Sequence, residues 1–348
     1  MAYTTIDDPS AYFHTQLYSG NGGTQSITND ANAGDFKPDF SWIKERSSTS
    51  NHILMDTTRG TSSALFSSLT NAESSTGNFI TSFDTDGFTL GNNGGLNQSS
   101  QTYVNWQWKA NGGTTSSNTD GSITSTVQAN TTAGFNIITY TGDGNAGATF
   151  GHGLGVVPNL IIVKRRDSGS RWNVWTPSLT NNQALYLDGN EATQSSTTFW
   201  NDTTPTSSVI TLGTDRNVNS GTYVCYAFKN IEGYSKIGTY TGNGSSDGTF
   251  VYTGFRPAWV MAKCTSTTSS WVIYDVKRKT FNVMNNSLLA NLSNAESTQT
   301  NAIMDILSNG FKLRGTASGW NSSGDTFIYM AFAEHPFVSS EGVPVTAR

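Results

Sequence analysis

Three lysines recur at equivalent places along the chain, and a repeated lysine can act as a nucleophile or bind an acidic ligand. Each follows a proline by six residues, and the pairs are Pro38/Lys44, Pro158/Lys164 and Pro257/Lys263. An aspartate lies twelve residues after the first and the third lysine, at Asp56 and Asp275, but the middle copy has Thr176 there. A Lys–Asp mechanism common to all three copies therefore lacks its carboxylate. We interpret the lysines as structural contacts at the ends of core strands.

Other residues with reactive side chains show no catalytic or metal-binding spacing. The histidines are His14, His52, His152 and His335, and they lack the spacing of zinc ligands. Asp84–Gly87 resembles the start of a calcium loop but has no acidic ligands downstream. Gly142–Gly147 reads G-x-G-x-x-G, yet no helical period follows, so we interpret it as a turn. No G-x-S-x-G, Ser/His/Asp order or repeated carboxylate pair occurs. We expect no metal, no cofactor and no enzymatic activity.

Two tryptophans are candidate ligand-binding residues. Trp200 and Trp320 each lie in a variable, polar region with no evident counterpart in the other copies. An aromatic side chain exposed on a loop can stack against a sugar ring or anchor a protein interface. The alternative is that each tryptophan covers the edge of its own sandwich.

The frame around the lysines is itself repeated, which must be recognised before a fold is assigned. Each copy opens on a turn of the type Tyr-Ser/Thr-Gly-Asn/Asp-Gly, at 18–22, 140–144 and 240–244. Each closes on a strand with alternating apolar residues, at 102–108, 222–228 and 326–332. Trp106, Tyr226 and Met330 hold equivalent positions on its apolar face. A repeated scaffold without a repeated reactive site indicates assembly or binding.

These repeats predict an all-β chain of three tandem β-sandwich or jelly-roll-like domains. We expect an N-terminal arm at 1–11, repeat domains at 12–110, 135–233 and 234–337, a linker rich in Gly, Ser, Thr and Asn at 111–134, and a C-terminal tail at 338–348. Alternation within Ile123–Val127 would also allow the linker to run as an extended strand. Whether the three domains stack as a rod or close into a triangle stays open.

Composition excludes several classes of partner. The net charge of −5 argues against nucleic acid, which requires a basic surface. No apolar run approaches the roughly 18 residues that span a membrane, and Met1–Ser10 is too polar for a signal peptide. Cys225 and Cys264 are too few for a disulfide framework and occupy non-equivalent places in the repeat. We expect synthesis in a reducing cytoplasm.

Several of these segments together resemble a repeat in virion structural proteins of marine tailed phages that infect cyanobacteria or SAR11-type bacteria, proteins often described as tail-fibre-like. The segments that carry the resemblance are the opening turn, Phe36–Lys44, Asp56–Gly60, Asp86–Leu90 and Tyr103–Trp108. The resemblance covers nearly the whole chain and is weakest in the second unit. It implies a virion component, assembled in the host cytoplasm, whose partners are other virion proteins. It supplies no catalytic residues.

Two roles follow from this resemblance. The first, which we favour from the sequence, is a tail-fibre or appendage protein that attaches to host-surface polysaccharide, for which Trp200 and Trp320 are the motive. The second is a capsid decoration or other purely structural virion protein, for which the three scaffold copies and the arm are the motive. A homo-oligomer, with a trimer favoured, suits either role. A threefold arrangement of the units within one chain would favour the second.

Overall fold

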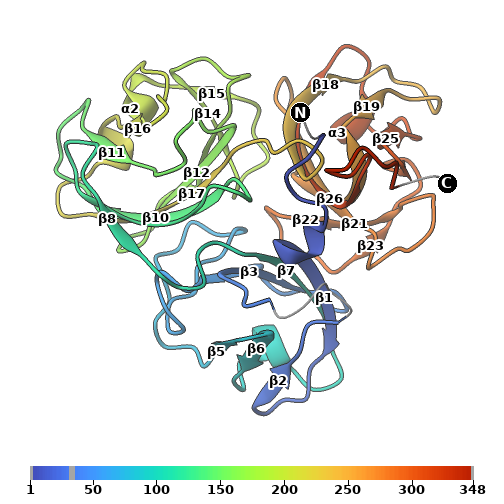
Figure 1. Cartoon of the computed structure of the whole chain (residues 1–348), viewed down its shortest axis with the longest axis horizontal. Coiled ribbons are helices and arrows are strands. Elements are labelled where there is room, and N and C mark those ends of the chain that lie inside the picture. Colours follow the sequence, from blue (N-terminus) through green and yellow to red (C-terminus); the bar gives the residue numbers. More distant parts are fainter. Residues whose placement is uncertain (1–2, 31–35, 346–348) are drawn as a thin grey trace.

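The computed structural model describes residues 3–30 and 36–345 and forms three lobes around a common centre (Figure 1). Strands take up 41% of the residues and helices 5%, which confirms the prediction of an all-β chain. We call the bodies lobe 1 (residues 12–110), lobe 2 (residues 111–233) and lobe 3 (residues 234–337). Within the described ranges no helix is long and apolar enough to span a membrane.

Each lobe contains a main antiparallel sheet with the same order of four strands. In that shared order the strands are β1 (Phe13–Ser19), β7 (Thr102–Trp108), β3 (Phe40–Glu45) and β4 (Ile53–Asp56) in lobe 1; β10 (Phe135–Thr141), β17 (Thr222–Phe228), β12 (Leu160–Arg165) and β13 (Asn173–Trp175) in lobe 2; and β18 (Ser235–Thr241), β26 (Thr326–Pro336), β20 (Phe255–Cys264) and β21 (Val272–Asp275) in lobe 3. The register repeats as well, because Thr15, Ile137 and Ile237 face Trp106, Tyr226 and Met330 across the first strand pair. The triangular arrangement, which the sequence left open, is plain in Figure 1.

Smaller elements complete each lobe. The outer strands are β14 (Gln183–Tyr186) and β15 (Gln194–Ser195) in lobe 2, and β22 (Asn286–Leu289) and β23 (Ser297–Thr298) in lobe 3. The second sheets are β2 (Gln25–Ile27), β6 (Gly87–Leu90) and β5 (Ile80–Asp84); β11 (Thr149–Gly151) and β16 (Val209–Thr211); and β19 (Phe250–Tyr252), β25 (Gly310–Leu313) and β24 (Met304–Leu307). The short helices are η1 (Pro9–Ala11), α1 (Gly94–Asn97), α2 (Thr197–Trp200), η2 (Thr214–Arg216) and α3 (Ser318–Asn321).

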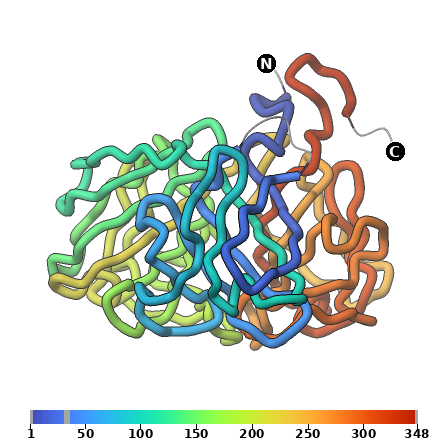
Figure 2. The backbone as a smooth tube through the Cα atoms, turned by 90° about the horizontal axis from the view of Figure 1, so that it is seen from below, coloured from blue at the N-terminus to red at the C-terminus, as the bar shows by residue number. Residues whose placement is uncertain are grey.

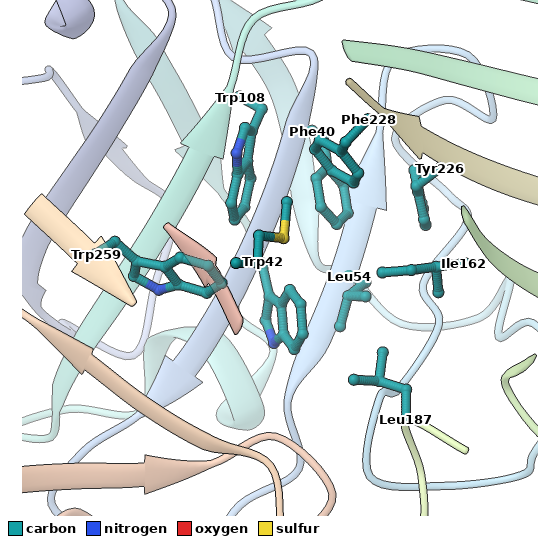
Figure 3. A pocket seen from close by; sticks show the side chains of 10 residues that line it. Phe40, Trp42, Leu54, Trp108, Ile162, Leu187, Tyr226, Phe228 and Trp259 are labelled. Atoms are coloured by element: carbon teal, nitrogen blue, oxygen red, sulfur yellow. The ribbon is translucent and has the colours of Figure 1, made fainter. Parts of the chain in front are cut away.

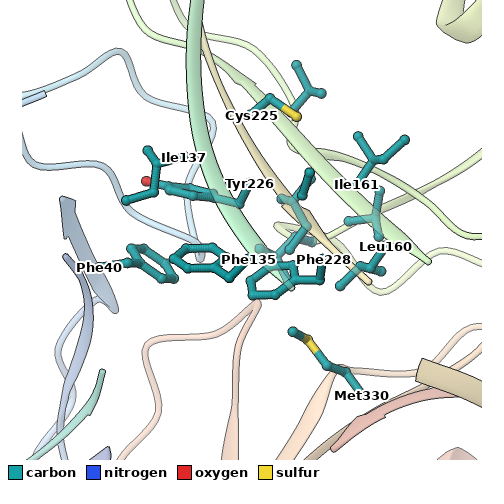
Figure 4. Close-up of a cluster of buried hydrophobic side chains, with 14 of the residues drawn as sticks. Phe40, Phe135, Ile137, Leu160, Ile161, Cys225, Tyr226, Phe228 and Met330 are labelled. Atoms are coloured by element: carbon teal, nitrogen blue, oxygen red, sulfur yellow. The ribbon is translucent and has the colours of Figure 1, made fainter. Parts of the chain in front are cut away.

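Both faces of the main sheets are buried. One face of β7 carries Tyr103 into the core of lobe 1, while the alternate residues Trp106 and Trp108 belong to a second core that all three lobes share. Figure 4 shows this shared core, where Phe40 of lobe 1 and Met330 of lobe 3 approach the aromatic residues of lobe 2. Since side chains alternate along a strand, one strand contributes to both cores.

A buried asparagine holds the opening turn of every lobe, and the three are Asn97, Asn217 and Asn321. In lobe 3 the Asn321 Oδ1 accepts the backbone N–H of Asn243 at 3.0 Å, and its Nδ2 donates to the carbonyls of Ser245 at 2.8 Å and Gly315 at 2.9 Å. The tyrosine of each turn donates its hydroxyl to a neighbouring carbonyl: Tyr18 to Leu96 at 2.8 Å, Tyr140 to Arg216 at 2.8 Å and Tyr240 to Trp320 at 2.9 Å. The repeated turn is therefore a structural motif.

Replacing Asn321 with alanine tests this motif. Asn321→Ala leaves the N–H of Asn243 and two carbonyls without their partner, and we expect a loss of about 1–3 kcal/mol in the free energy of unfolding. Urea denaturation measures the loss, and amide hydrogen exchange at residues 242–246 should accelerate. Asn294→Ala, at an exposed position, is the control and should change stability by less than about 0.5 kcal/mol. Equal effects of the two substitutions would contradict the assignment.

The predicted linker and the arm are both packed against the lobes. Residues 111–134, predicted as a linker, contribute β8 (Ser116–Asn118) and β9 (Ser125–Asn130), and β9 pairs with the outer edge of β10. Its alternating residues can pair with the sheet, so the extended-strand alternative holds for this part. The described part of the arm contacts lobes 2 and 3 of the same chain: Tyr3 Oη donates to the carbonyl of Gly254 in lobe 3 at 2.7 Å, and Thr4 Oγ1 donates to the carbonyl of Glu232, near the end of lobe 2, at 2.8 Å. The arm and the C-terminal tail project from one face (Figure 2).

Candidate functional site at the joints between the lobes

Three aromatic residues at equivalent positions meet where the lobes converge. The ring centroids of Trp108 and Phe228 lie 6.3 Å apart, those of Trp108 and Phe332 5.5 Å, and those of Phe228 and Phe332 6.1 Å. Figure 3 shows the neighbouring cavity, lined by Trp42, Tyr226, Trp259 and other residues from all three lobes. Its volume is about 10 Å³, which is at the lower limit for one water molecule. The centre, as formed by the described residues, is packed core.

The predicted anchor residues lie around this core. Trp106, Tyr226 and Met330 are buried in the shared core. Pro38 and Pro158 are buried two residues before β3 and β12, while Pro257 lies within β20 at an irregularity in its pairing with β26. A proline lacks the N–H of a regular ladder, so these positions at a strand start or a bulge suit it.

The three lysines are fully buried and donate to backbone carbonyls. Lys164 Nζ lies 2.6 Å from the carbonyl oxygen of Ser170 and 2.9 Å from that of Thr70 in lobe 1. Lys263 Nζ lies 2.6 Å from the carbonyl of Cys264 and 3.5 Å from that of Asn190 in lobe 2. Lys44 Nζ donates to the carbonyls of its own loop, at Glu45 and Ser48. Two of the three therefore join neighbouring lobes.

Burial gives these lysines a distinctive pH dependence. It lowers the pKa of Lys44, Lys164 and Lys263 to about 8, against an ordinary 10.5. Between these values the unfolded chain binds more protons than the folded one, so the lysines make stability rise as the pH rises. We expect wild-type stability relative to Lys164→Met to increase from pH 8 to about 9.5, below the ordinary tyrosine pKa of about 10. Urea denaturation of both proteins at each pH measures it, and parallel profiles would contradict the expectation.

Equivalent hydrogen bonds join each lobe to the next. In every case a loop of one lobe, between the third and fourth strands of its main sheet, donates to carbonyls of the neighbouring lobe. The backbone contacts are Ser170 to Thr70 at 2.7 Å, Ser269 to Asn190 at 2.7 Å and Ser50 to Ser293 at 2.9 Å. The side-chain contacts run from a ring nitrogen to a backbone carbonyl: Trp172 to Phe66 at 2.9 Å, Trp271 to Tyr186 at 2.8 Å and His52 to Leu289 at 3.0 Å. Lobe 2 thus contacts lobe 1, lobe 3 contacts lobe 2 and lobe 1 contacts lobe 3, which closes a ring.

At the joint between lobes 1 and 3, His52 makes the contact that Trp172 and Trp271 make at the other two joints. Its Nδ1 accepts from Trp42 Nε1 at 2.9 Å, so its Nε2 is the nitrogen that donates to Leu289. Burial holds the pKa of His52 well below its ordinary value, which keeps the imidazole neutral. A neutral imidazole with a proton on Nε2 provides the same single donor as an indole.

A buried ionic network spans the joint between lobes 1 and 2. Arg59 lies 2.6 Å from Asp56 and 2.6 Å from Glu73, all in lobe 1. From lobe 2, Arg166 lies 2.8 Å from Glu73, and the hydroxyl of Tyr226 donates to Asp56 at 2.8 Å. Burial alone would raise the pKa of Glu73, but the two guanidinium groups outweigh it and hold that pKa below its ordinary value. The network therefore contains paired charges.

The same network recurs between lobes 3 and 1. Arg278 pairs with Asp275 at 2.5 Å and with Glu296 at 2.9 Å within lobe 3. From lobe 1, Arg46 pairs with Glu296 at 2.9 Å, and Trp106 Nε1 donates to Asp275 at 3.0 Å. Each position matches its counterpart in the first network through the repeat.

The joint between lobes 2 and 3 lacks the whole set. Thr176, Leu179 and Thr193 occupy the places of the aspartate, arginine and glutamate in lobe 2, and Met330 replaces the aromatic donor of lobe 3. The Thr193 backbone N–H still donates to Thr265 of lobe 3 at 2.9 Å. Every charged member is absent together, as expected because a single remaining buried charge would be strongly unfavourable. This explains why the middle copy lacks the aspartate.

The two candidate ligand-binding tryptophans are buried, so this prediction is wrong. Trp200 is 1% exposed and Trp320 is 0% exposed. Their indole N–H groups donate to the carbonyls of Gln183 at 2.9 Å and Ile303 at 3.2 Å. The alternative, that each covers its own lobe, agrees with the structure. Trp320 also has a counterpart, since Trp320-Asn321 in α3 matches Leu96-Asn97 in α1.

The described parts of the chain form neither a metal-binding group of His, Cys, Asp or Glu side chains nor a disulfide. Residues 3–30 and 36–345 contain no group of three or more His, Cys, Asp or Glu side chains that could hold a metal ion. Cys225 and Cys264 are free and buried. The arginines Arg59 and Arg278 were missed as site residues, although each follows its aspartate by three residues in both copies that retain the aspartate.

Comparison with known proteins gives one match. A family model described as "Domain of unknown function (DUF7483)" matches residues 8–336. No curated protein and no solved structure matches the chain.

Proposed function

The chain belongs to the DUF7483 family, and for this member we propose the role of a virion structural protein that provides a threefold surface from a single chain, as a capsid decoration protein would. The proposal rests on one observation: three sheets of the same strand order close into a ring through equivalent contacts. Its virion setting rests on the resemblance to phage structural proteins described above.

Ring closure within one chain supports a role at a threefold position. Head-to-tail contacts generate a closed ring when the rotation between units closes, as in cyclic homo-oligomers. Here the covalent chain supplies all three units, so the expected species in solution is a monomer of 37.4 kDa. The homotrimer favoured from the sequence is not needed to build threefold symmetry.

The expectation of attachment to host polysaccharide depended on Trp200 and Trp320 being exposed. Trp200 and Trp320 are buried, so they present no aromatic face to a sugar. An attachment role would have to use other residues, and we therefore place the structural role first.

Copy number in purified virions tests the proposal. Quantitative mass spectrometry of this chain against the major capsid protein should give a number matching the threefold positions of the capsid. A small number, in multiples of three or six, would place the protein on the tail and favour the fibre role. Absence from purified virions would exclude a virion role.

The mass in solution tests, independently of the copy number, whether a single chain forms the threefold unit. Size-exclusion chromatography with light scattering should give the monomer mass at all accessible concentrations. A homotrimer would contradict the use of a single chain as a threefold unit, whatever the copy number.

A further inference from the structure

The second sheet of lobe 3 carries two rows of side chains on its outer face. The sheet lies on the side of lobe 3 away from the shared centre (Figure 1). Strand pairing aligns one row across β19, β25 and β24 at Phe250, Lys312 and Asp305, and the next at Tyr252, Gly310 and Leu307. The residues between the rows point the other way, into the core of lobe 3, and are Val251, Phe311 and Ile306.

The other two lobes have small polar residues at the place of Phe250. Ser26 pairs with Thr89 in lobe 1, and Thr149 pairs with Thr211 in lobe 2, where Phe250 pairs with Lys312 in lobe 3. Phe250 is 44% exposed and Tyr252 is 51% exposed. The scaffold that the three lobes share therefore does not require this exposed aromatic surface.

The Phe250 ring leans over the neighbouring strand. A Cβ atom on Gly310 would lie 3.2 Å from the ring, so a glycine at this position leaves room for it. A ring that covers a glycine of the adjacent strand packs one face against the sheet and leaves the other face to the solvent. Tyr252 adds a second ring in the next row, and its hydroxyl lies 3.3 Å from that of Tyr3 in the arm. Phe250 thus forms a flat apolar platform.

The charged side chains beside this platform are paired with one another. Lys312 Nζ lies 2.6 Å from Asp247, and the Arg314 guanidinium lies 3.2 Å from Asp305 and 3.8 Å from Asp247. Two acidic and two basic groups give zero net charge, so the set suits a neutral ligand better than an ion. Asp247, Asp305 and Arg314 also line a depression of about 530 Å³, a volume typical of small-ligand sites.

We propose that this face of lobe 3 binds a neutral saccharide, with the C–H face of a pyranose ring stacked on Phe250 and its hydroxyl groups bonded to the paired side chains. Each hydroxyl can donate to a carboxylate and accept from a basic group, which suits a site that offers both. An aromatic anchor of a protein interface fills a desolvated pocket, whereas Phe250 lies flat beside a polar depression. The inference goes beyond the threefold role and does not depend on it.

A microarray of neutral and anionic bacterial oligosaccharides, probed with the fluorescently labelled full chain, tests the proposal. We expect binding to at least one neutral oligosaccharide. For the one that binds most strongly, isothermal titration calorimetry should show binding about tenfold weaker in Phe250→Ser, because the stacking surface is lost. Serine is the residue that lobe 1 has at this position.

Val157→Ser is the matched control, because it removes an apolar side chain of similar exposure, 42%, from lobe 2. Wild-type affinity in this control and weakened affinity in Phe250→Ser would support the proposal. Should Phe250→Ser fail to fold, Lys312→Thr, which introduces the residue that both other lobes have, must weaken binding instead.

Three results on the array would overturn the proposal: no binding to any neutral oligosaccharide, binding to anionic ones alone, or equal affinity in Phe250→Ser and the control. Self-association of the wild type that Phe250→Ser abolishes, as measured by light scattering, would also overturn it, because the face would then be a protein interface.

Discussion

Replacing Trp108 with alanine is expected to lower the free energy of unfolding by about 3–5 kcal/mol, the range for removing a large aromatic side chain from a core. Trp108 is 1% exposed and contacts aromatic rings of both other lobes, at Phe228 and Phe332. The cavity would open where the three lobes converge, and none of them can fill it without moving away from the other two.

Urea denaturation followed by circular dichroism measures this loss. Phe281→Ala removes an aromatic side chain that is 79% exposed, so it should change stability by less than about 0.5 kcal/mol. Because the lobes share one core, wild type should unfold in a single transition. A loss below 1 kcal/mol in Trp108→Ala, or separate transitions for the lobes, would contradict a common core.

Replacing Arg59 with leucine is the second large effect that we expect. Arg59 and Asp56 are both fully buried as a pair. The substitution leaves the Asp56 carboxylate in the joint with only the Tyr226 hydroxyl and backbone donors, and removing one partner of a buried pair costs about 3–5 kcal/mol. The loss is again measured as the change in the free energy of unfolding.

The joint between lobes 2 and 3 indicates how this loss can be reversed. That joint has Thr176, Leu179, Thr193, Met330 and Thr265 in place of the five network residues Asp56, Arg59, Glu73, Tyr226 and Arg166. The combined variant with Asp56→Thr, Arg59→Leu, Glu73→Thr, Tyr226→Met and Arg166→Thr should therefore recover most of the stability that Arg59→Leu loses, since replacing the whole set leaves no buried charge without its partner. A combined variant less stable than Arg59→Leu would show that the residues of the joint between lobes 2 and 3 cannot replace those of the joint between lobes 1 and 2.

The strands and their repetition follow from the sequence because period-two alternation is a local signal. Residues 160–163, Leu-Ile-Ile-Val, are apolar on both faces, and the structure buries both faces of β12. The structure places β12 between β13 and β17, with these four residues in the core that the lobes share. Which lobe meets which could not be predicted, because the joints consist of contacts between residues far apart in the chain, such as Trp172 with Phe66.

The candidate site was predicted less well than the fold. The polar sequence around Trp200 and Trp320 suggested exposed loops, but tertiary packing buries both side chains. The match of Trp320-Asn321 with Leu96-Asn97 was available in the sequence, and it places Trp320 in a core position. By contrast, the threonine at position 176, where the other copies have aspartate, is visible in the sequence and marks the joint that lacks the ionic network.

Closure of the ring within one polypeptide has a consequence for how the molecule can evolve. In a homotrimer encoded by one gene, every substitution at an interface appears three times, so an unfavourable step is tripled. Here each substitution alters a single joint, and its neighbours retain their original contacts. The joint between lobes 2 and 3, with its uncharged replacement of the charged set, is what such independent divergence produces, while the overall symmetry of the ring persists.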